Sequence, residues 1–131
     1  MKKRGILNAK LAGFIAALGH KDLFMIGDAG MPIPKGVEIV DLALTANVPT
    51  FKQTLDAILD EATIEGYILP EEIIEHNPTL HEHIKKSLPN LQAEFMPHDD
   101  LKKFSANVKF AIRTGEFSPY PNIILRAGIV F

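Results

Sequence analysis

The spacing of apolar residues near the start of the chain predicts an amphipathic helix over residues 9–18. Four apolar residues recur at i, i+3, i+4 and i+7, on one helix face: Leu11, Phe14, Ile15 and Leu18. Asn8 is a suitable N-cap, and Gly19 is a suitable residue to end the helix. The basic start and apolar run are similar to a secretory signal, but Asn8 and Lys10 interrupt the pattern. We therefore expect a helix of the folded domain.

Apolar runs alternate with helical spacings along the rest of the chain. Strands are predicted over residues 23–26, 37–44, 67–69, 91–95 and 122–131. Helices are predicted over residues 51–62, from Asn77 as N-cap and Pro78 through residue 88, and over residues 100–114, where Gly115 ends the helix. Strands that alternate with helices require crossover connections. We expect one α/β domain over residues 1–131, with a mostly parallel sheet flanked by helices.

The predicted strand over residues 23–26 lies between two groups that can transfer protons. His20 precedes the strand, and Asp28 follows it in the run "GDAG". Open parallel sheets bind ligands beyond the carboxyl ends of their strands, which is where Asp28 is expected. A histidine can both give and take a proton near neutral pH. The structural alternative is a His20 favoured by the helix dipole and a turn-forming Asp28.

Two further stretches carry candidate polar groups. In "MPHDDLKKF", His98 and Lys102 are four residues apart and can face the same space, and either His98 or Asp99 is expected to cap the helix that follows. In "FSPYPN", prolines on both sides of Tyr120 stiffen an extended segment, which would present Tyr120 and Asn122 as a binding wall. The structural alternatives are a solvated lysine beside a capping residue, and a stiffened loop that enters the last strand.

Composition and charge exclude several classes of function. The 131 residues include 14 Lys and Arg and 16 Asp and Glu, so the formal net charge is −2, and neither a nucleic-acid footprint nor a polybasic membrane patch is present. The absence of cysteine excludes disulfides and thiolate chemistry and suits a reducing cytosol. In "LHEHIKK", His81 and His83 are two residues apart and point to different helix faces, so we expect no zinc site there. No apolar run approaches the length of a membrane span.

The motifs, taken together, resemble a known family. The resemblance rests on the apolar C-terminus and on "MKKRGILNAKL", "LGHKDLFMIGDAGMPIP", "PHDDLKKF" and "ANVKFAIRTGEFSPYPNIIL". In this order and register they resemble the D-ribose pyranase group of the ribose pyranase and fucose mutarotase family, over essentially the whole chain. The resemblance implies a cytoplasmic enzyme that interconverts the pyranose and furanose forms of free D-ribose, with no metal and no organic cofactor. It also implies a ring-shaped homo-oligomer, a decamer of two stacked pentamers, with sites at subunit boundaries.

The resemblance also implies roles for individual residues. His20, from "GHKD", is the implied proton donor. The implied sugar-binding residues are Asp28, His98 with the nearby Lys102, Tyr120 and Asn122. Ring change opens the hemiacetal and closes it through a different hydroxyl, so one group removes the anomeric proton while another protonates the ring oxygen. We expect His20 to be this proton shuttle, with Asp28 orienting either His20 or a sugar hydroxyl.

Two alternative functions use the same residues differently. A non-catalytic sugar-binding accessory protein of ribose uptake would bind ribose in the same pocket, and a purely structural ring protein would leave the polar residues without a shared role. For a site at a subunit boundary, we expect one subunit to supply His20 and Asp28 and its neighbour to supply Tyr120 and Asn122. The apolar end of the chain, residues 129–131, is expected to be buried in the sheet or at that boundary.

Overall fold

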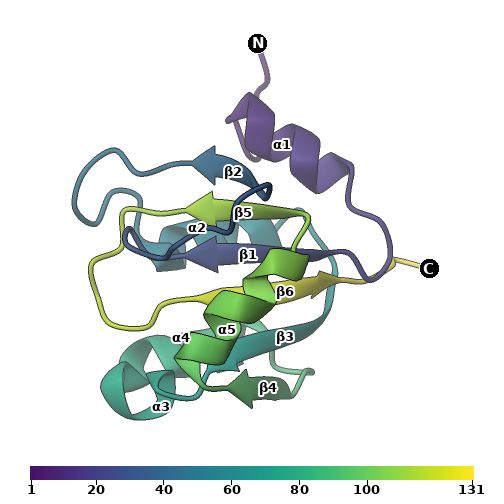
Figure 1. Ribbon diagram of the computed structural model, residues 1–131. Helices are drawn as coiled ribbons and strands as arrows, with labels where there is room; N and C mark the ends of the chain where they lie inside the picture. Colours follow the sequence, from purple (N-terminus) through teal and green to yellow (C-terminus); the bar gives the residue numbers. More distant parts are fainter.

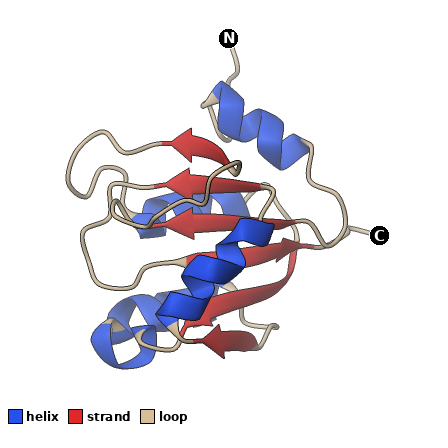
Figure 2. Cartoon of the chain, viewed as in Figure 1, coloured by secondary structure: helices blue, strands red, loops and turns tan.

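Six strands form one sheet in the order β2-β5-β1-β6-β3-β4 in the computed structural model, which describes residues 1–131 (Figure 1). The strands are β1 (Leu23–Gly27), β2 (Glu38–Asp41), β3 (Ile64–Pro70), β4 (Ala93–Met96), β5 (Phe110–Arg113) and β6 (Ile123–Ala127). The helices are α1 (Ala9–Ala16), α2 (Phe51–Leu59), α3 (Ile73–His76), α4 (Pro78–Ser87) and α5 (His98–Phe104), which the 3₁₀ turn η1 (Ser105–Asn107) follows (Figure 2). None of these helices has the length and apolar character needed to cross a membrane.

Five strands run in one direction, and β6 runs against them. β5 pairs in parallel with both β1 and β2, and β3 pairs in parallel with β4. β6 lies between β1 and β3 and is antiparallel to both. The predicted α/β domain with a mostly parallel sheet flanked by helices is therefore confirmed. The carboxyl ends of the five parallel strands meet at one edge of the sheet, and β6 begins at that same edge (Figure 1).

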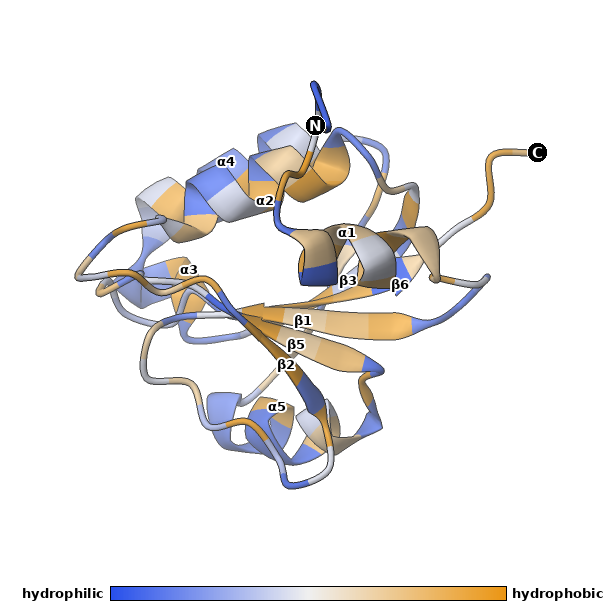
Figure 3. Ribbon diagram, turned by 90° about the horizontal axis from the view of Figure 1, so that it is seen from above, coloured by the Kyte–Doolittle hydropathy of each residue, from blue (hydrophilic) through white to orange (hydrophobic).

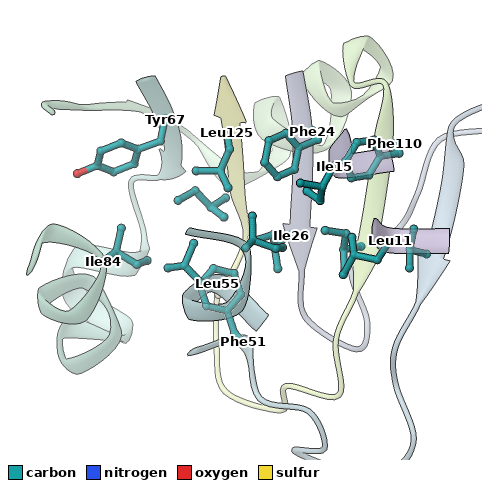
Figure 4. Packing of buried hydrophobic residues seen from close by; sticks show 14 of the residues in the cluster. Leu11, Ile15, Phe24, Ile26, Phe51, Leu55, Tyr67, Ile84, Phe110 and Leu125 are labelled. Carbon is teal, nitrogen blue, oxygen red and sulfur yellow. The ribbon is translucent and has the colours of Figure 1, made fainter. Parts of the chain in front are cut away.

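Helices cover both faces of the sheet, and a hydrophobic cluster fills each interface. In Figure 3, α1, α2 and α4 lie on one face and α5 lies on the other. Phe24 and Ile26 of β1 contribute to the larger cluster, beneath α1, α2 and α4 (Figure 4). Met25, between them in the sequence, joins Leu101 of α5 in the smaller cluster on the opposite face. This alternation follows the two-residue period of a strand, and burial on both faces explains the continuous apolar run of β1.

Most predicted elements are present, but their ends differ. Asn8 caps α1 as predicted, because its Oδ1 accepts the backbone N–H of Leu11 at 2.9 Å. The helix ends at Ala16, so the prediction that Gly19 ends it is wrong. The predicted strands over residues 37–44, 67–69 and 91–95 correspond to β2, β3 and β4, and α2 falls within the predicted residues 51–62. No predicted element corresponds to α3, because four residues are too few to show a helical period.

The predicted helix over residues 100–114 is wrong. α5 ends at Phe104, and after η1 the chain forms β5, between β1 and β2 in the sheet. Phe110, Ala111 and Ile112 are each at most 1% exposed, so β5 is covered on both faces. A short apolar run of this kind does not distinguish a buried strand from a buried helix, and the two-sided burial of a central parallel strand produces the same pattern.

The predicted strand over residues 122–131 is shorter in the structure. β6 covers Ile123–Ala127, and the chain leaves the sheet after it. Ile129, Val130 and Phe131 are 43%, 86% and 97% exposed, so the expectation that this end is buried in the sheet is wrong. We refer to residues 129–131 as the apolar tail. Its burial at a subunit boundary stays a prediction.

Candidate active site

A cavity of about 610 Å³ lies at the edge of the sheet where the parallel strands end. Four elements line it: the loop after β1 with Asp28, the start of α5 with His98, the end of β5 with Arg113, and the loop that precedes β6 with Glu116 and Tyr120. We refer to it as the carboxyl-edge cavity. Its position agrees with the expectation that Asp28 faces a pocket beyond the end of its strand.

Asn122 joins Asp28 to His98 at this cavity. Its Oδ1 accepts the backbone N–H of Asp28 at 3.1 Å, and its Nδ2 donates to Asp28 Oδ2 at 3.0 Å. The same Nδ2 lies 3.2 Å from His98 Nε2. Because Asn122 is fully buried, these contacts hold the two side chains in one arrangement. The Tyr120 ring packs edge-on against His98, with ring centroids 5.1 Å apart. Four predicted sugar-binding residues therefore lie together in a single chain.

His98 is held as a neutral hydrogen-bonding group. Burial lowers its pKa below the usual 6.5, and the nearby positive charge of Lys102 lowers it further, against the opposing effects of Glu72, Asp28 and Asp99. A neutral imidazole has one ring nitrogen free to accept a hydrogen bond. Since the Asn122 amide nitrogen is a donor, His98 Nε2 is the acceptor of this pair. His98 therefore contributes polarity to the cavity without adding a charge at neutral pH.

The start of α5 differs from its prediction. Neither His98 nor Asp99 caps the helix with its side chain. The backbone N–H of His98 instead donates to both carboxylate oxygens of Glu72, at 3.0 Å each. Lys102 pairs with Asp99 at 3.5 Å and does not line the cavity, so the structure places it near His98 but outside the cavity wall.

Tyr120 is held in an unusual backbone conformation. Its φ is +61°, in the left-handed region that bulky residues rarely adopt. Asn77 holds the preceding loop, since its Nδ2 donates to Ser118 Oγ at 3.0 Å and to the Pro119 carbonyl at 2.9 Å. Asn77 is also the N-cap residue of α4 and Pro78 begins the helix, as predicted, but the Asn77 side chain makes no capping hydrogen bond. Backbone strain that neighbouring residues maintain is frequent at functional sites.

Sequence reasoning missed two charged residues of the cavity, Arg113 and Glu116. Arg113 Nε donates to the Ala29 carbonyl at 3.0 Å, and its guanidinium pairs with Asp41 at 3.0 Å. Glu116 accepts the backbone N–H of Phe51 at 2.7 Å and so ties the cavity loop to α2. A strand assignment over residues 110–113 would have placed Arg113 at the carboxyl edge. Because a helix was predicted there, no strand end was expected at Arg113.

His20 does not lie at the carboxyl-edge cavity. It precedes β1, whereas Asp28 follows it, and the five-residue strand separates the two by roughly 15 Å. His20 Nε2 lies 2.8 Å from Glu65 Oε2, and His20 lines a separate hollow of about 270 Å³ together with the apolar tail. The hypothesis that Asp28 orients His20 within one subunit is therefore wrong. The expected division is also wrong, because within one subunit Asp28 is hydrogen-bonded to Asn122 and shares the carboxyl-edge cavity with Tyr120, whereas His20 lies at the other end of β1.

The two histidines of "LHEHIKK" have separate partners. His83 Nε2 lies 2.8 Å from Asp56 Oδ1, and the His81 ring packs edge-on against Phe95 at 5.9 Å between centroids. No group of three His, Cys, Asp or Glu side chains in the chain is arranged to hold a metal ion.

Comparison with known proteins identifies relatives along the whole chain. Residues 1–130 match the RbsD / FucU transport protein family. The chain is 49% identical to a D-ribose pyranase of Limosilactobacillus fermentum and 47% identical to one of Streptomyces avermitilis, each over 131 residues that cover both proteins completely. The structure of Bacillus subtilis RbsD complexed with D-ribose is 40% identical, with a TM-score of 0.95 over all of both chains. A fucose mutarotase from Streptococcus pneumoniae, solved with L-fucose, shares the fold at 19% identity, with a TM-score of 0.76 over 95% of each chain.

Proposed function

The chain belongs to the RbsD / FucU transport protein family, and on this premise we propose that it is a D-ribose pyranase. It is a mutarotase that interconverts the pyranose and furanose forms of free D-ribose. The observation that carries the proposal is the identity of nearly one half to D-ribose pyranases over the full length of both chains. The cavity at the carboxyl edge supplies a place for the sugar.

The residues of the carboxyl-edge cavity suit a neutral sugar. Asp28 offers a carboxylate that accepts hydrogen bonds from hydroxyl groups, and Asn122 and neutral His98 fix its position. Tyr120 presents a ring face and a hydroxyl group. We assign sugar binding to these four residues. Lys102, paired with Asp99, acts on the site through His98. The reaction breaks and forms only the hemiacetal C–O bond, so proton transfer is sufficient and the chemistry needs no cofactor.

We assign proton transfer to His20 and place it in the site from a second subunit. His20 and Asp28 lie at opposite edges of one sheet, so a sugar held by Asp28 meets His20 only if another copy supplies it. Two features support such a contact. His20 is 43% exposed and lies beside the exposed apolar tail. Phe117, in the wall of the carboxyl-edge cavity, is 69% exposed, and exposed apolar groups of this kind favour association.

Assembly into a ring would repeat this contact at every boundary. Head-to-tail contacts between identical subunits close into rings, and each boundary then joins two different edges of the subunit. We propose a decamer of two stacked pentamers in the cytoplasm. The absence of cysteine and the use of a free sugar as substrate support a cytoplasmic location.

Saturation-transfer NMR between the ring forms of D-ribose tests the function directly. The protein should accelerate exchange between pyranose and furanose signals in proportion to its concentration. The family's description as transport proteins favours a second candidate, a non-catalytic accessory of ribose uptake. Such a protein would broaden ribose signals without accelerating their exchange, and that result would refute the proposed enzyme.

A further inference from the structure

Glu65 is the hydrogen-bonding partner of His20. The distance from Glu65 Oε2 to His20 Nε2 is 2.8 Å, and no hydrogen bond within the chain uses the second ring nitrogen of His20. We infer that Glu65 is a positioning residue, which holds the His20 ring for proton transfer in ribose ring interconversion. This inference rests on the proposed function, in which His20 moves the proton. Nothing in the sequence pattern singled out Glu65.

An irregularity in β3 places Glu65 toward His20. Ile64 pairs with Ala127, and Gly66 pairs with Arg126, so Glu65 is the extra residue of a β-bulge. The consequence is visible in the packing. Ile64 and Tyr67 are three residues apart, yet both pack in the larger hydrophobic cluster, which a regular two-residue period does not allow. A bulge changes the direction of a side chain, and bulges are frequent beside active sites.

Arg126 holds the other side of the Glu65 carboxylate. Its Nε lies 3.6 Å from Glu65 Oε1, and its Nη2 lies 3.4 Å from Glu94 Oε1. Gly66 provides the space for this arrangement, because a Cβ atom there would overlap the Arg126 guanidinium. Glu65 therefore uses Oε1 for Arg126 and Oε2 for His20. The contact on each oxygen limits rotation of the carboxylate, and so fixes the direction of its hydrogen bond to the ring.

This geometry defines how His20 would work. When Nε2 carries the hydrogen and donates it to Glu65, Nδ1 has a free lone pair. Nδ1 then accepts the proton of the anomeric hydroxyl, the C–O bond to the ring oxygen breaks, and the proton is returned to that oxygen. No net proton is gained or lost in the ring opening. The Glu65 carboxylate stabilises the positive imidazolium while it holds the proton, as a carboxylate does for the histidine of a hydrolytic triad.

Asp56 offers a matched control for Glu65. It pairs with His83 at the same distance of 2.8 Å, and His83 has no part in the proposed site. The test measures pyranose–furanose exchange by saturation-transfer NMR over a range of ribose concentrations. Sedimentation of each variant is measured to establish that its assembly matches the parent protein.

We expect Glu65→Ala to lower kcat by about 6-fold to 60-fold, more than an exposed ion pair alone contributes and less than loss of the acid–base group itself. KM should not change, because Glu65 lies outside the carboxyl-edge cavity. Glu65→Gln keeps the shape and an acceptor oxygen, so it should fold like the parent and recover part of the rate. Asp56→Ala should exchange ribose at the parent rate.

A double variant separates positioning from a structural role. If Glu65 acts through His20, Glu65→Ala adds no further loss when His20→Ala is already present. Three results would each overturn the inference. Glu65→Ala could keep the parent kcat, it could raise KM at unchanged kcat, or it could lower kcat by the same factor in the His20→Ala background. Failure of the proposed function looks different: the parent protein would not accelerate exchange, or His20→Ala would exchange ribose at the parent rate, and Glu65 would then have no catalytic group to position.

Discussion

Mixed assemblies of two inactive variants provide the sharpest test of the proposal that the active site is divided between subunits. His20→Ala and Tyr120→Ala should each abolish most exchange. His20 lies in an exposed loop before β1, and its loss removes no buried contact, so the His20→Ala fold should be intact. Dissociated together and reassembled, these two variants should recover activity, because His20 of one subunit and Tyr120 of another then meet at some boundaries.

The expected recovery follows from the proposed division of the site between two subunits. At equal mixing, about one half of the subunits are the Tyr120→Ala variant and carry an intact His20. The other half are the His20→Ala variant and carry an intact Tyr120. If a site combines His20 from one subunit with Tyr120 from its neighbour, as we propose, about one quarter of the boundaries should be fully intact. The recovery should vary as the product of the two fractions and be largest at equal mixing.

A second mixture distinguishes the present division from the alternatives. Asp28 and Tyr120 belong to one chain, joined through His98 and Asn122, so Asp28→Asn mixed with Tyr120→Ala leaves every cavity with one defect. Saturation-transfer NMR on both reassembled mixtures should detect recovery in the first alone. Recovery in neither mixture would show that each subunit builds its site alone, and recovery in the second would show that Asp28 and Tyr120 act in different subunits.

Three further predictions concern the neighbourhood of the cavity. The pKa of His98 is lowered in the folded state, so neutral His98 contributes stability above about pH 6.5 that is lost as the pH falls toward the lower folded-state pKa. Lys102→Met should raise this pKa in an NMR titration and reduce the loss of unfolding free energy at acid pH, measured by urea unfolding. The control variant Lys103→Met should change neither the pKa nor the loss of stability. Asn77→Ala removes two hydrogen bonds to the loop before Tyr120, so we expect a loss of about 1–3 kcal/mol in urea unfolding together with weaker ribose binding, and unchanged binding would contradict a positioning role. EDTA should leave exchange unaltered, and a loss that zinc restores would refute a mechanism based on proton transfer alone.

Much of the carboxyl-edge site could be predicted because it follows from strand direction. β1 is an uninterrupted apolar run, so its limits are clear, and the group that follows it must lie at the carboxyl edge. The contact of Asp28 with Asn122 is different in kind. The two residues are 94 positions apart in the chain, and their contact requires β6 to lie beside β1 and antiparallel to it. The pairing order of strands depends on which surfaces fit in three dimensions, and the hydrophobic pattern of each strand does not record it.

The wrong helix prediction at residues 110–113 has a physical cause, and it also affected the prediction of the cavity residues. The three buried residues Phe110, Ala111 and Ile112 fit a helix and a strand equally well by composition, and the helical spacing of the preceding residues favours extending the helix. Because β5 was missed, Arg113 and Glu116 were not expected at the cavity. Glu65 was missed for another reason. Its role depends on a bulge, and the extra residue of a bulge is defined by the partner strand, which a single sequence does not show.

The separation of His20 from Asp28, by contrast, follows from the predicted strand alone. Two residues that flank one extended strand lie at opposite edges of the sheet, because each residue of the strand advances the chain by about 3.3 Å. A proton cannot be exchanged between such groups through one small sugar. A reaction that needs both groups, as we propose, would therefore have to draw them from two copies of the chain. His20 with its Glu65 partner would form one half of each active site, and Asp28 with its Asn122 and His98 partners would form the other.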